Sequence, residues 1–222
     1  MGQVVWPARV TQQGWIAPAR VVRSAALVFG AAALVGGYLV WRGGWPIVAI
    51  GLLGILCGVT YTGGPLPFGY FGLGDLIVAA FFGPVAVGGT ALVQAQRCLP
   101  GWGWASVGPG ALCAAILVVN NLRDRQTDAR AGKRTLAVRW GARACRWEYG
   151  LLLLAAFVAP VLAVARGRLS AGVLVVALAL PLALLELRRV WRREGAALNP
   201  SLGGTARLAL LYGALFALGA QW

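Results

Sequence analysis

The sequence contains no histidine and few charged side chains. The absence of His excludes metal sites ligated by imidazole and catalysis by a His general base. Charged residues make up 12% of the 222 residues, whereas soluble domains contain about 25%. Hydrophobic residues make up 59% and the mean hydropathy is +0.75, and a bilayer solvates such an apolar chain where water does not. The composition therefore predicts an integral membrane protein.

Cysteine and acidic residues are also scarce. The four Cys residues show no CxxC spacing, so we interpret them as small apolar residues without a disulfide or zinc role. Six residues are acidic and 20 are basic, which gives a formal net charge of +14. In a membrane protein, basic residues mark cytoplasmic loops more often than a nucleic-acid interface. We therefore expect a lipid bilayer as a partner and no nucleic acid.

Seven apolar segments are long enough to cross a membrane, for which a helix needs about 20 residues. Clusters of Gly, Pro, Asn and Ser separate these segments and predict turns. We predict an all-α fold, a polytopic membrane helical bundle of about seven transmembrane helices in a single domain over residues 1–222. The predicted spans are 24–41, 45–61, 74–95, 102–121, 145–165, 169–187 and 204–221.

The distribution of basic residues predicts the orientation of these spans. If the N-terminus is cytoplasmic, 16 of the 20 Lys and Arg residues lie on the cytoplasmic side and four lie outside. The opposite orientation would reverse this bias and contradict the positive-inside rule. We therefore expect a multi-pass membrane protein with a cytoplasmic N-terminus and a cytoplasmic Asp-rich loop.

One stretch, residues 120–139, concentrates much of the charge. Asn120, Asp124 and Asp128 are spaced i, i+4, i+8, so on a helix they project from one face at steps of about 6 Å. Oxygen ligands of this kind suit Mg²⁺, which takes one or two carboxylates together with substrate phosphates. The basic residues that we expect to contact the remaining phosphate oxygens are Arg123, Lys133 and Arg134.

Asn121 adds an amide three residues before Asp124. The alternative is a solvated loop in which Asp and Arg side chains merely pair along the helix. The position of the carboxylates beside a membrane span favours a functional site, because ionisable groups are costly there. The residues alone thus predict a site for Mg²⁺ and a diphosphate.

A second unusual segment, YTGGPLPFGYFGLGDL, covers residues 61–76. Its Gly and Pro residues predict a shaped loop with close backbone packing. Asp75 follows at the beginning of an apolar span, either as a first-turn carboxylate that interacts with the helix dipole or as an acid that contacts a polar substrate or a second metal. The remaining acids, Glu148, Glu186 and Glu194, lie near basic residues, and we interpret them as charge partners.

These segments resemble a known family. NNLRDRQTDARAGKRTLAVRWG (residues 120–141) closely resembles the second aspartate-rich motif of UbiA-type intramembrane prenyltransferases, and more narrowly their 1,4-dihydroxy-2-naphthoate polyprenyltransferase branch. The segment at 61–76 and FFGPVAVGGTALVQ (81–94) resemble the loop and the following helix of that branch. ARVTQQGWIAP (8–18) resembles its loop before the third helix.

The resemblance implies a nine-helix bundle in the bacterial inner membrane, in which two cytoplasmic aspartate-rich motifs hold Mg²⁺ and a polyprenyl diphosphate. It implies transfer of the prenyl group to 1,4-dihydroxy-2-naphthoate with loss of diphosphate and CO₂, a step of menaquinone biosynthesis. By this likeness Asp124 and Asp128 would ligate Mg²⁺ with support from Asn120 or Asn121. Arg123, Lys133 and Arg134 are then candidates for contact with the diphosphate. The candidates near the aromatic acceptor are Tyr61, Tyr70 and Asp75.

The sequence departs from the family pattern in one respect. The family's first motif, NxxxDxxxD, has no counterpart here, since Asp75 is the one acidic residue before Asp124. We therefore expect the seven spans to correspond to helices three to nine, with the first two helices lacking, and we expect the chain to be inactive alone and active when extended upstream. The alternatives are a catalytically dead fragment of a disrupted gene, a prenyltransferase with another aromatic acceptor, and a transporter or structural membrane protein.

Overall fold

The computed structural model describes residues 15–62, 72–97 and 99–222. The chain divides into two units, residues 1–48 and 49–222, and each is described by itself. In the first unit, α1 (Pro18–Gly43) begins with Pro at its first turn, where the missing N–H costs no hydrogen bond. It ends before Gly44, whose φ is 68°. Together with its hydropathy, the length of 26 residues allows α1 to cross a membrane.

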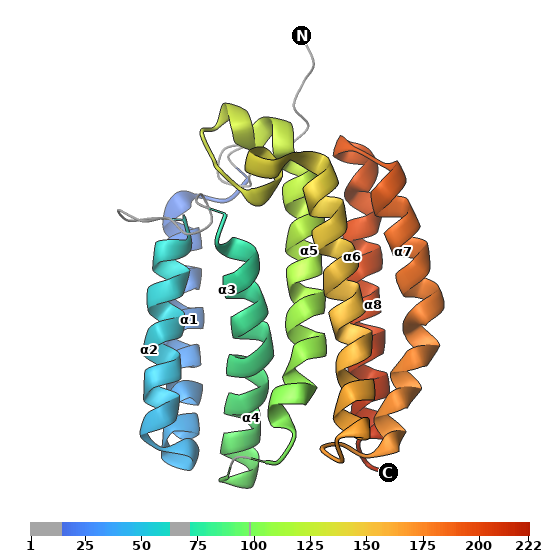
Figure 1. Cartoon of the computed structure of the whole chain (residues 1–222). Helices are drawn as coiled ribbons and strands as arrows, with labels where there is room; N and C mark the ends of the chain where they lie inside the picture. The colour runs from blue at the N-terminus through green and yellow to red at the C-terminus, as the bar shows by residue number, and fades with distance from the viewer. Residues whose placement is uncertain (1–14, 63–71, 98) are drawn as a thin grey trace. The chain divides into compact units, whose positions relative to one another are not determined.

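The second unit contains helices and no strands over its described residues (Figure 1). It contains most of α2 (Trp45–Thr62), and a continuous span formed by α3 (Gly74–Ala80), a π-helical segment (Phe81–Val85) and α4 (Ala86–Ala95). Then follow α5 (Trp102–Arg130) and α6 (Leu136–Ala165). A 3₁₀ segment (Ala171–Ala179) leads into α7 (Leu180–Arg192), and another (Gly195–Leu198) leads into α8 (Asn199–Gly219).

The predicted all-α membrane bundle is confirmed. Six helical segments of the described chain are long and apolar enough to span a membrane. The remaining predicted span, 45–61, coincides with α2, in which Trp45–Gly58 forms a shorter apolar helix. Pro84 accounts for the π-helical turn within the third span, because Pro lacks the N–H of the regular ladder.

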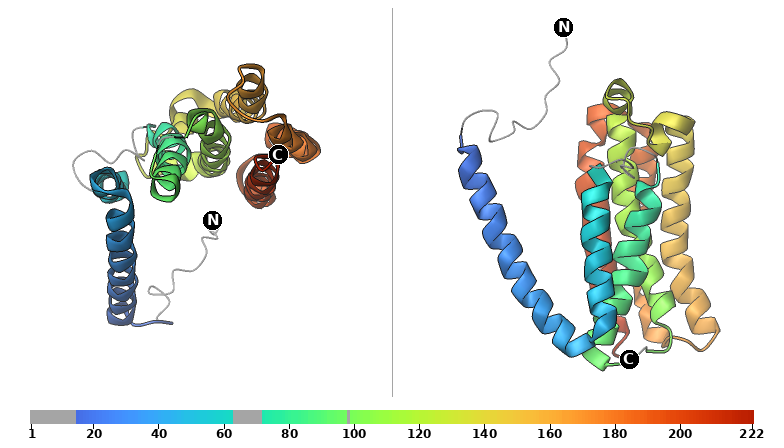
Figure 2. Two further views of the ribbon diagram at one scale, coloured as in Figure 1. Left: turned by 90° about the horizontal axis from the view of Figure 1, so that it is seen from below. Right: turned by 90° about the vertical axis from the view of Figure 1, so that its left-hand side faces the viewer.

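Helix α5 lies at the centre of the core, where its buried face packs against α3, α6 and α8. Seen along the helix axes, α3 to α8 follow one another around an arc (Figure 2). Small residues permit the closest approach. A Cβ on Gly110 would lie 2.5 Å from the carbonyl oxygen of Ala79, and one on Gly83 would lie 2.8 Å from that of Ser106. Close backbone contact of this kind is how membrane helices gain packing energy.

Buried tyrosines join α6 to α8. Tyr212 donates a hydrogen bond of 2.8 Å to the carbonyl oxygen of Ala156. The hydroxyl groups of Tyr149 and Thr205 lie 3.0 Å apart, and Thr205 donates to the carbonyl oxygen of Ser201. These bonds satisfy polar groups that no water reaches and fix the register of α8 against α6.

The hairpin connections place two sets of junctions at opposite ends of the second unit (Figure 1). The junctions α5–α6 and α7–α8 lie at one end, together with the beginning of α3. The junctions α4–α5 and α6–α7 lie at the other, where Gly101 closely approaches Arg168. We call the first of these the charged end, because the stretch 120–139 lies there.

Candidate functional site

The last turns of α5 carry the residues that the sequence singled out. Helix α5 continues into the charged stretch as far as Arg130. Asn120, Asp124 and Asp128 are therefore on one helix, as their spacing predicts. Gly132 adopts a φ of 73° and turns the chain. Thr135 then accepts a hydrogen bond from the N–H of Val138 and caps α6. Gly141, with φ 81° and ψ 176°, breaks α6 shortly after its beginning. The charged stretch is therefore a helix end, a turn and a short helix.

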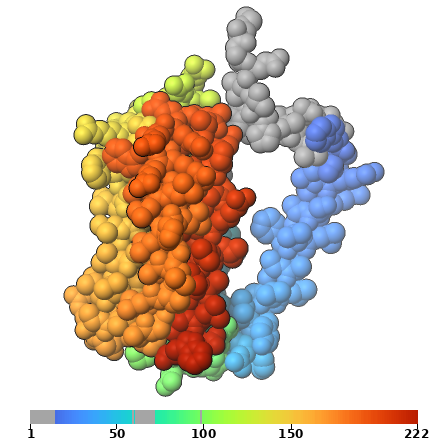
Figure 3. Space-filling model, turned by 90° about the vertical axis from the view of Figure 1, so that its right-hand side faces the viewer, coloured from blue at the N-terminus to red at the C-terminus, as the bar shows by residue number. Residues whose placement is uncertain are grey.

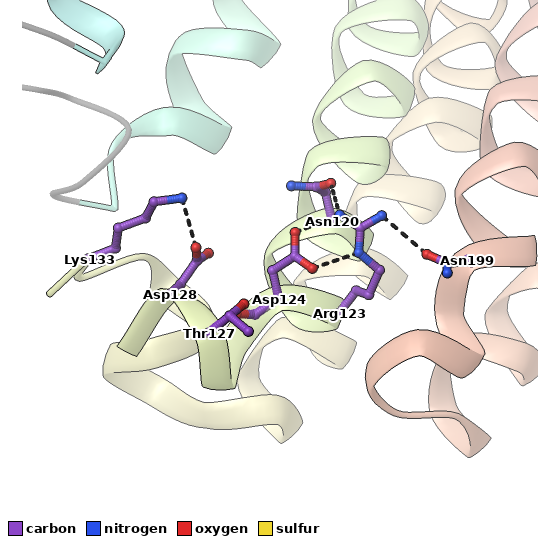
Figure 4. Close-up of polar contacts among 7 residues, drawn as sticks. All are labelled: Asn120, Arg123, Asp124, Thr127, Asp128, Lys133 and Asn199. Atoms are coloured by element: carbon purple, nitrogen blue, oxygen red, sulfur yellow. Dashed lines mark hydrogen bonds and ion pairs between the residues drawn. The ribbon is translucent and has the colours of Figure 1, made fainter. Parts of the chain in front are cut away.

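Arg123 is the centre of the hydrogen-bond network at this end of α5 (Figure 4). Its guanidinium binds the carboxylate of Asp124 through two bonds, Nε to Oδ1 at 2.7 Å and Nη2 to Oδ2 at 2.5 Å. The same group donates to Oδ1 of Asn120 at 2.9 Å and to Oδ1 of Asn199 at 3.2 Å. A two-point bond to a carboxylate is the strong, directional form of an Arg ion pair.

Asp128 forms a separate ion pair. Its Oδ1 lies 2.7 Å from Nζ of Lys133, and its carboxylate is almost completely buried whereas the Lys133 side chain is about a third exposed. Between the two ion pairs, the hydroxyl of Thr127 donates to the carbonyl oxygen of Asp124 at 2.8 Å. Figure 4 shows that Asp124 and Asp128, both on α5, are bound by different basic side chains, Arg123 and Lys133.

Asp75 and Asn121 form a third polar contact, one that joins two helices. Asp75 lies in the first turn of α3, and the amide of Asn121 donates to its Oδ1 at 3.2 Å and to its Oδ2 at 3.5 Å. Both side chains are buried. Asn121 thus faces α3, while Asn120 joins Arg123 and Asp124. The structure assigns the two adjacent amides to different contacts.

The other predicted residues have different outcomes. Arg134 is exposed. Tyr70 lies outside the described residues, and of Tyr61 the structure describes only the backbone, in α2. Asn199 was missed, because the sequence Asn-Pro-Ser was interpreted only as a turn, although it begins α8 and meets Arg123.

The interpretation of the three Glu residues as charge partners is right for two of them. Glu186 pairs with Arg189 at 2.6 Å and Glu194 with Arg146 at 3.0 Å. Glu148 is half-buried on α6, and no Lys or Arg of the described part of the chain lies within ion-pair distance of it. Its nearness in sequence to Arg146 therefore did not predict its partner, because the two side chains leave α6 in different directions.

The donor set at the end of α5 fits a hard cation. Two carboxylates and one amide supply only oxygen ligands, the type that Mg²⁺ prefers. No group of three or more His, Cys, Asp and Glu side chains gathers within the described ranges. A cation at this place would therefore take the rest of its ligands from water or from a bound phosphate, as Mg²⁺ commonly does.

Comparisons with known proteins give the family of the chain. Residues 6–216 match the model of the UbiA prenyltransferase family. The chain is 41% identical over 220 residues to a 1,4-dihydroxy-2-naphthoate octaprenyltransferase of Mycobacterium tuberculosis. This alignment covers 97% of this chain and 73% of that protein. Proteins with the same name from Haemophilus influenzae and Escherichia coli are 40% and 37% identical over 172 and 177 residues.

The chain is shorter than these relatives. The alignments cover 77% and 78% of this chain, but only 56% and 58% of the Haemophilus influenzae and Escherichia coli proteins. The family model, in contrast, matches nearly the whole chain, and the fold is a polytopic helical membrane bundle with an aspartate-rich helix end. The chain therefore belongs to the UbiA prenyltransferase family.

Proposed function

We propose that this protein transfers a polyprenyl group from its diphosphate to 1,4-dihydroxy-2-naphthoate in menaquinone biosynthesis. The observation that carries the proposal is the pair of carboxylates on one helix end, Asp124 in the Arg123 network and Asp128 in its ion pair with Lys133. Three relatives with 37–41% identity share the name 1,4-dihydroxy-2-naphthoate octaprenyltransferase, which supports this pair of substrates. In the reaction the allylic C–O bond breaks, its electron pair leaves with the diphosphate, and a ring carbon forms the new C–C bond as the carboxyl group departs as CO₂.

The leaving diphosphate carries about three negative charges, and its departure requires positioned positive charge. We assign Asp124 and Asp128 as ligands of Mg²⁺, with Asn120 as a supporting oxygen. Mg²⁺, when bound, supplies charge neutralisation on the phosphate oxygens. Arg123 and Lys133, which hold these carboxylates here, would contact phosphate oxygens of the bound diphosphate, Arg123 at two points and Lys133 as a point charge. Arg134, exposed beside Lys133, is a further candidate for contact with the diphosphate.

The acceptor is assigned to the side of α5 that faces α3. Asp75 is held by Asn121, and a buried carboxylate oriented in this way can accept a hydrogen bond from a ring hydroxyl of the naphthoate. Tyr61 and Tyr70 belong to the neighbouring segment and are proposed to contact the aromatic ring. In this arrangement the amide of Asn120 lies on the diphosphate side of the site, and the amide of Asn121 lies on the acceptor side.

The site is proposed to face the cytoplasm of a bacterial cell. Both substrates are anionic, and the excess of Lys and Arg at the charged end would attract them. The same bias supports a cytoplasmic location of this end by the positive-inside rule.

The test uses the 222-residue chain in membranes and measures two quantities. The first is Mg²⁺-dependent binding of a radiolabelled polyprenyl diphosphate. The second is formation of the prenylated product from added naphthoate, which would overturn the expectation from the sequence that this chain alone is inactive. We expect Asp124→Asn and Asp128→Asn each to reduce Mg²⁺-dependent binding by at least tenfold, because each removes a charged ligand. Glu194→Gln is the matched control, since Glu194 is exposed and pairs with Arg146 outside this network. Binding that is independent of Mg²⁺, or equal in all four proteins, contradicts the assignment.

A further inference from the structure

The outer surface of α6 and α7 at the charged end carries two tryptophans in direct contact. The rings of Trp147 and Trp191 meet edge to face, with centroids 5.3 Å apart and an interplanar angle of 88°. Both side chains are also exposed, by 57% and 36%. Figure 3 shows the surfaces of the helices around them side by side along this face. Exposed Trp side chains are typical of the depth at which lipid headgroups meet the apolar core.

Three exposed arginines lie within about one turn of this pair along α6 and α7. Arg143 lies one turn before Trp147 on α6, and Arg188 lies one turn before Trp191 on α7. Arg192 lies one turn after Arg188, so the two share a face of α7. Because α6 begins and α7 ends at the charged end, Arg143 and Arg192 both lie beyond the tryptophans, toward water. We call these five residues the α6–α7 rim.

The charges of the rim arginines are not compensated by ion pairs among the described residues. Each of Asp124, Asp128, Glu186 and Glu194 forms its ion pair with another basic residue. In the described part of the chain, no ion pair joins Arg143, Arg188 or Arg192 to an acidic side chain. Three guanidinium groups around one aromatic pair therefore form a surface that attracts an anion.

The neighbouring surface toward the middle of the membrane is apolar. Leu151 and Leu154 follow Trp147 on the same face of α6 and are more than half exposed. Leu184 occupies the corresponding position one turn before Arg188 on α7, and it is also exposed. A ligand that fits this sequence of surfaces has a negative headgroup, an interfacial segment and long acyl chains.

We propose that the α6–α7 rim binds an anionic phospholipid. Its phosphate contacts Arg143, Arg188 and Arg192, its glycerol lies against the two tryptophans, and its acyl chains follow the leucines of α6 and α7. The rim is separate from the Arg123 network, because in the described part of the chain the bonds of Arg123 go to Asp124, Asn120 and Asn199 and to no rim residue. This site does not depend on the proposed transferase activity.

The test is native mass spectrometry of the detergent-purified full chain, titrated with phosphatidylglycerol or phosphatidylcholine. We expect preferential retention of phosphatidylglycerol, and a loss of its affinity of tenfold or more in R143Q/R188Q/R192Q, since each arginine near a membrane surface adds about fivefold. The control, R97Q/R166Q/R168Q, removes three exposed arginines at the opposite end, where Arg166 also lies over a Trp ring, that of Trp104, at 5.0 Å. It should keep the preference.

The proposal is overturned if the unchanged protein retains both lipids equally, or if the two triple variants lose phosphatidylglycerol equally. It is also overturned if soluble diphosphate displaces the lipid, because the rim would then be a site for a free anion. R143K/R188K/R192K keeps the charge and is a control for misfolding of the Gln variant. It should retain most of the preference for phosphatidylglycerol, and a loss as large as that of the Gln variant would also count against a phosphate site.

Discussion

The contact between Gly204 and Glu186 provides the sharpest test of the packing between α7 and α8. Glu186 is completely buried, and its carboxylate lies directly over the Cα of Gly204. A Cβ at that position would lie 2.7 Å from Oε2 of Glu186 and closer still to Oε1. An exposed Glu would swing aside, but Glu186 is held by Arg189 at 2.6 Å. Gly204→Ala therefore forces the carboxylate away from its partner.

The magnitude follows from three contributions. Overpacking a filled interface costs about 1–3 kcal/mol, and separating a buried ion pair costs about 3–5 kcal/mol. Because Arg189 is itself 36% exposed, solvent screens the pair and the lower end applies. Replacing Gly by Ala within a helix returns about 1 kcal/mol. We expect Gly204→Ala to destabilise the protein by about 3 kcal/mol.

A double-mutant cycle separates this mechanism from a general effect of substitution. Glu186→Ala removes the obstructing carboxylate, so Gly204→Ala added to that background should be neutral or slightly stabilising. Gly203→Ala is the matched control, since a Cβ there meets nothing within 4 Å. The assay is reversible unfolding in mixed detergent micelles, followed by circular dichroism. If the two substitutions prove additive, or Gly203→Ala destabilises as much as Gly204→Ala, the packing argument is refuted.

Three further predictions concern the site and the core. Arg123→Lys loses the two-point bond to Asp124, and we expect transfer to fall about 10²-fold in the product assay; wild-type turnover would contradict its role. Asn199→Ala removes one charge-assisted bond, so we expect about a tenfold fall, and an unchanged rate would show that α8 does not support the guanidinium. Gly110→Ala brings a methyl group against the backbone of α3 and should cost about 1–3 kcal/mol in the unfolding assay; unchanged stability would show that the two helices are not in close contact.

The membrane spans could be predicted from the sequence because length and hydropathy are local properties. The spacing of Asn120, Asp124 and Asp128 also predicted a continuous helix, and α5 does extend through them to Arg130. Local spacing did not predict how these side chains divide among partners. The ion pair of Asp128 depends on the turn at Gly132 that returns Lys133 to it, and the bond from Arg123 to Asn199 depends on a neighbouring helix.

Contacts between distant residues were beyond local reasoning. Asp75 was expected near the site from its position at the beginning of a span, but its bond to Asn121 joins residues 46 positions apart. Asn199 gave no signal, because an Asn before Pro at the start of a helix is ordinary turn chemistry. Its contact with Arg123 arises only when α8 packs beside α5. The orientation in the membrane and the binding of Mg²⁺ stay predictions.

The packing of α8 and the chemistry at the end of α5 are physically connected. Asn199 lies five residues before Gly204, about 7.5 Å along the same helix, and its bond to Arg123 is already 3.2 Å long. An outward shift of α8 by a few tenths of an ångström would lengthen this bond beyond useful range. We therefore expect Gly204→Ala to reduce prenyl transfer about tenfold at a temperature where the protein stays folded, as Asn199→Ala does, and Glu186→Ala to restore the rate when the two are combined. If Gly204→Ala retains full activity while losing stability, the position of α8 does not control Arg123, and the guanidinium is held by Asp124 and Asn120 alone.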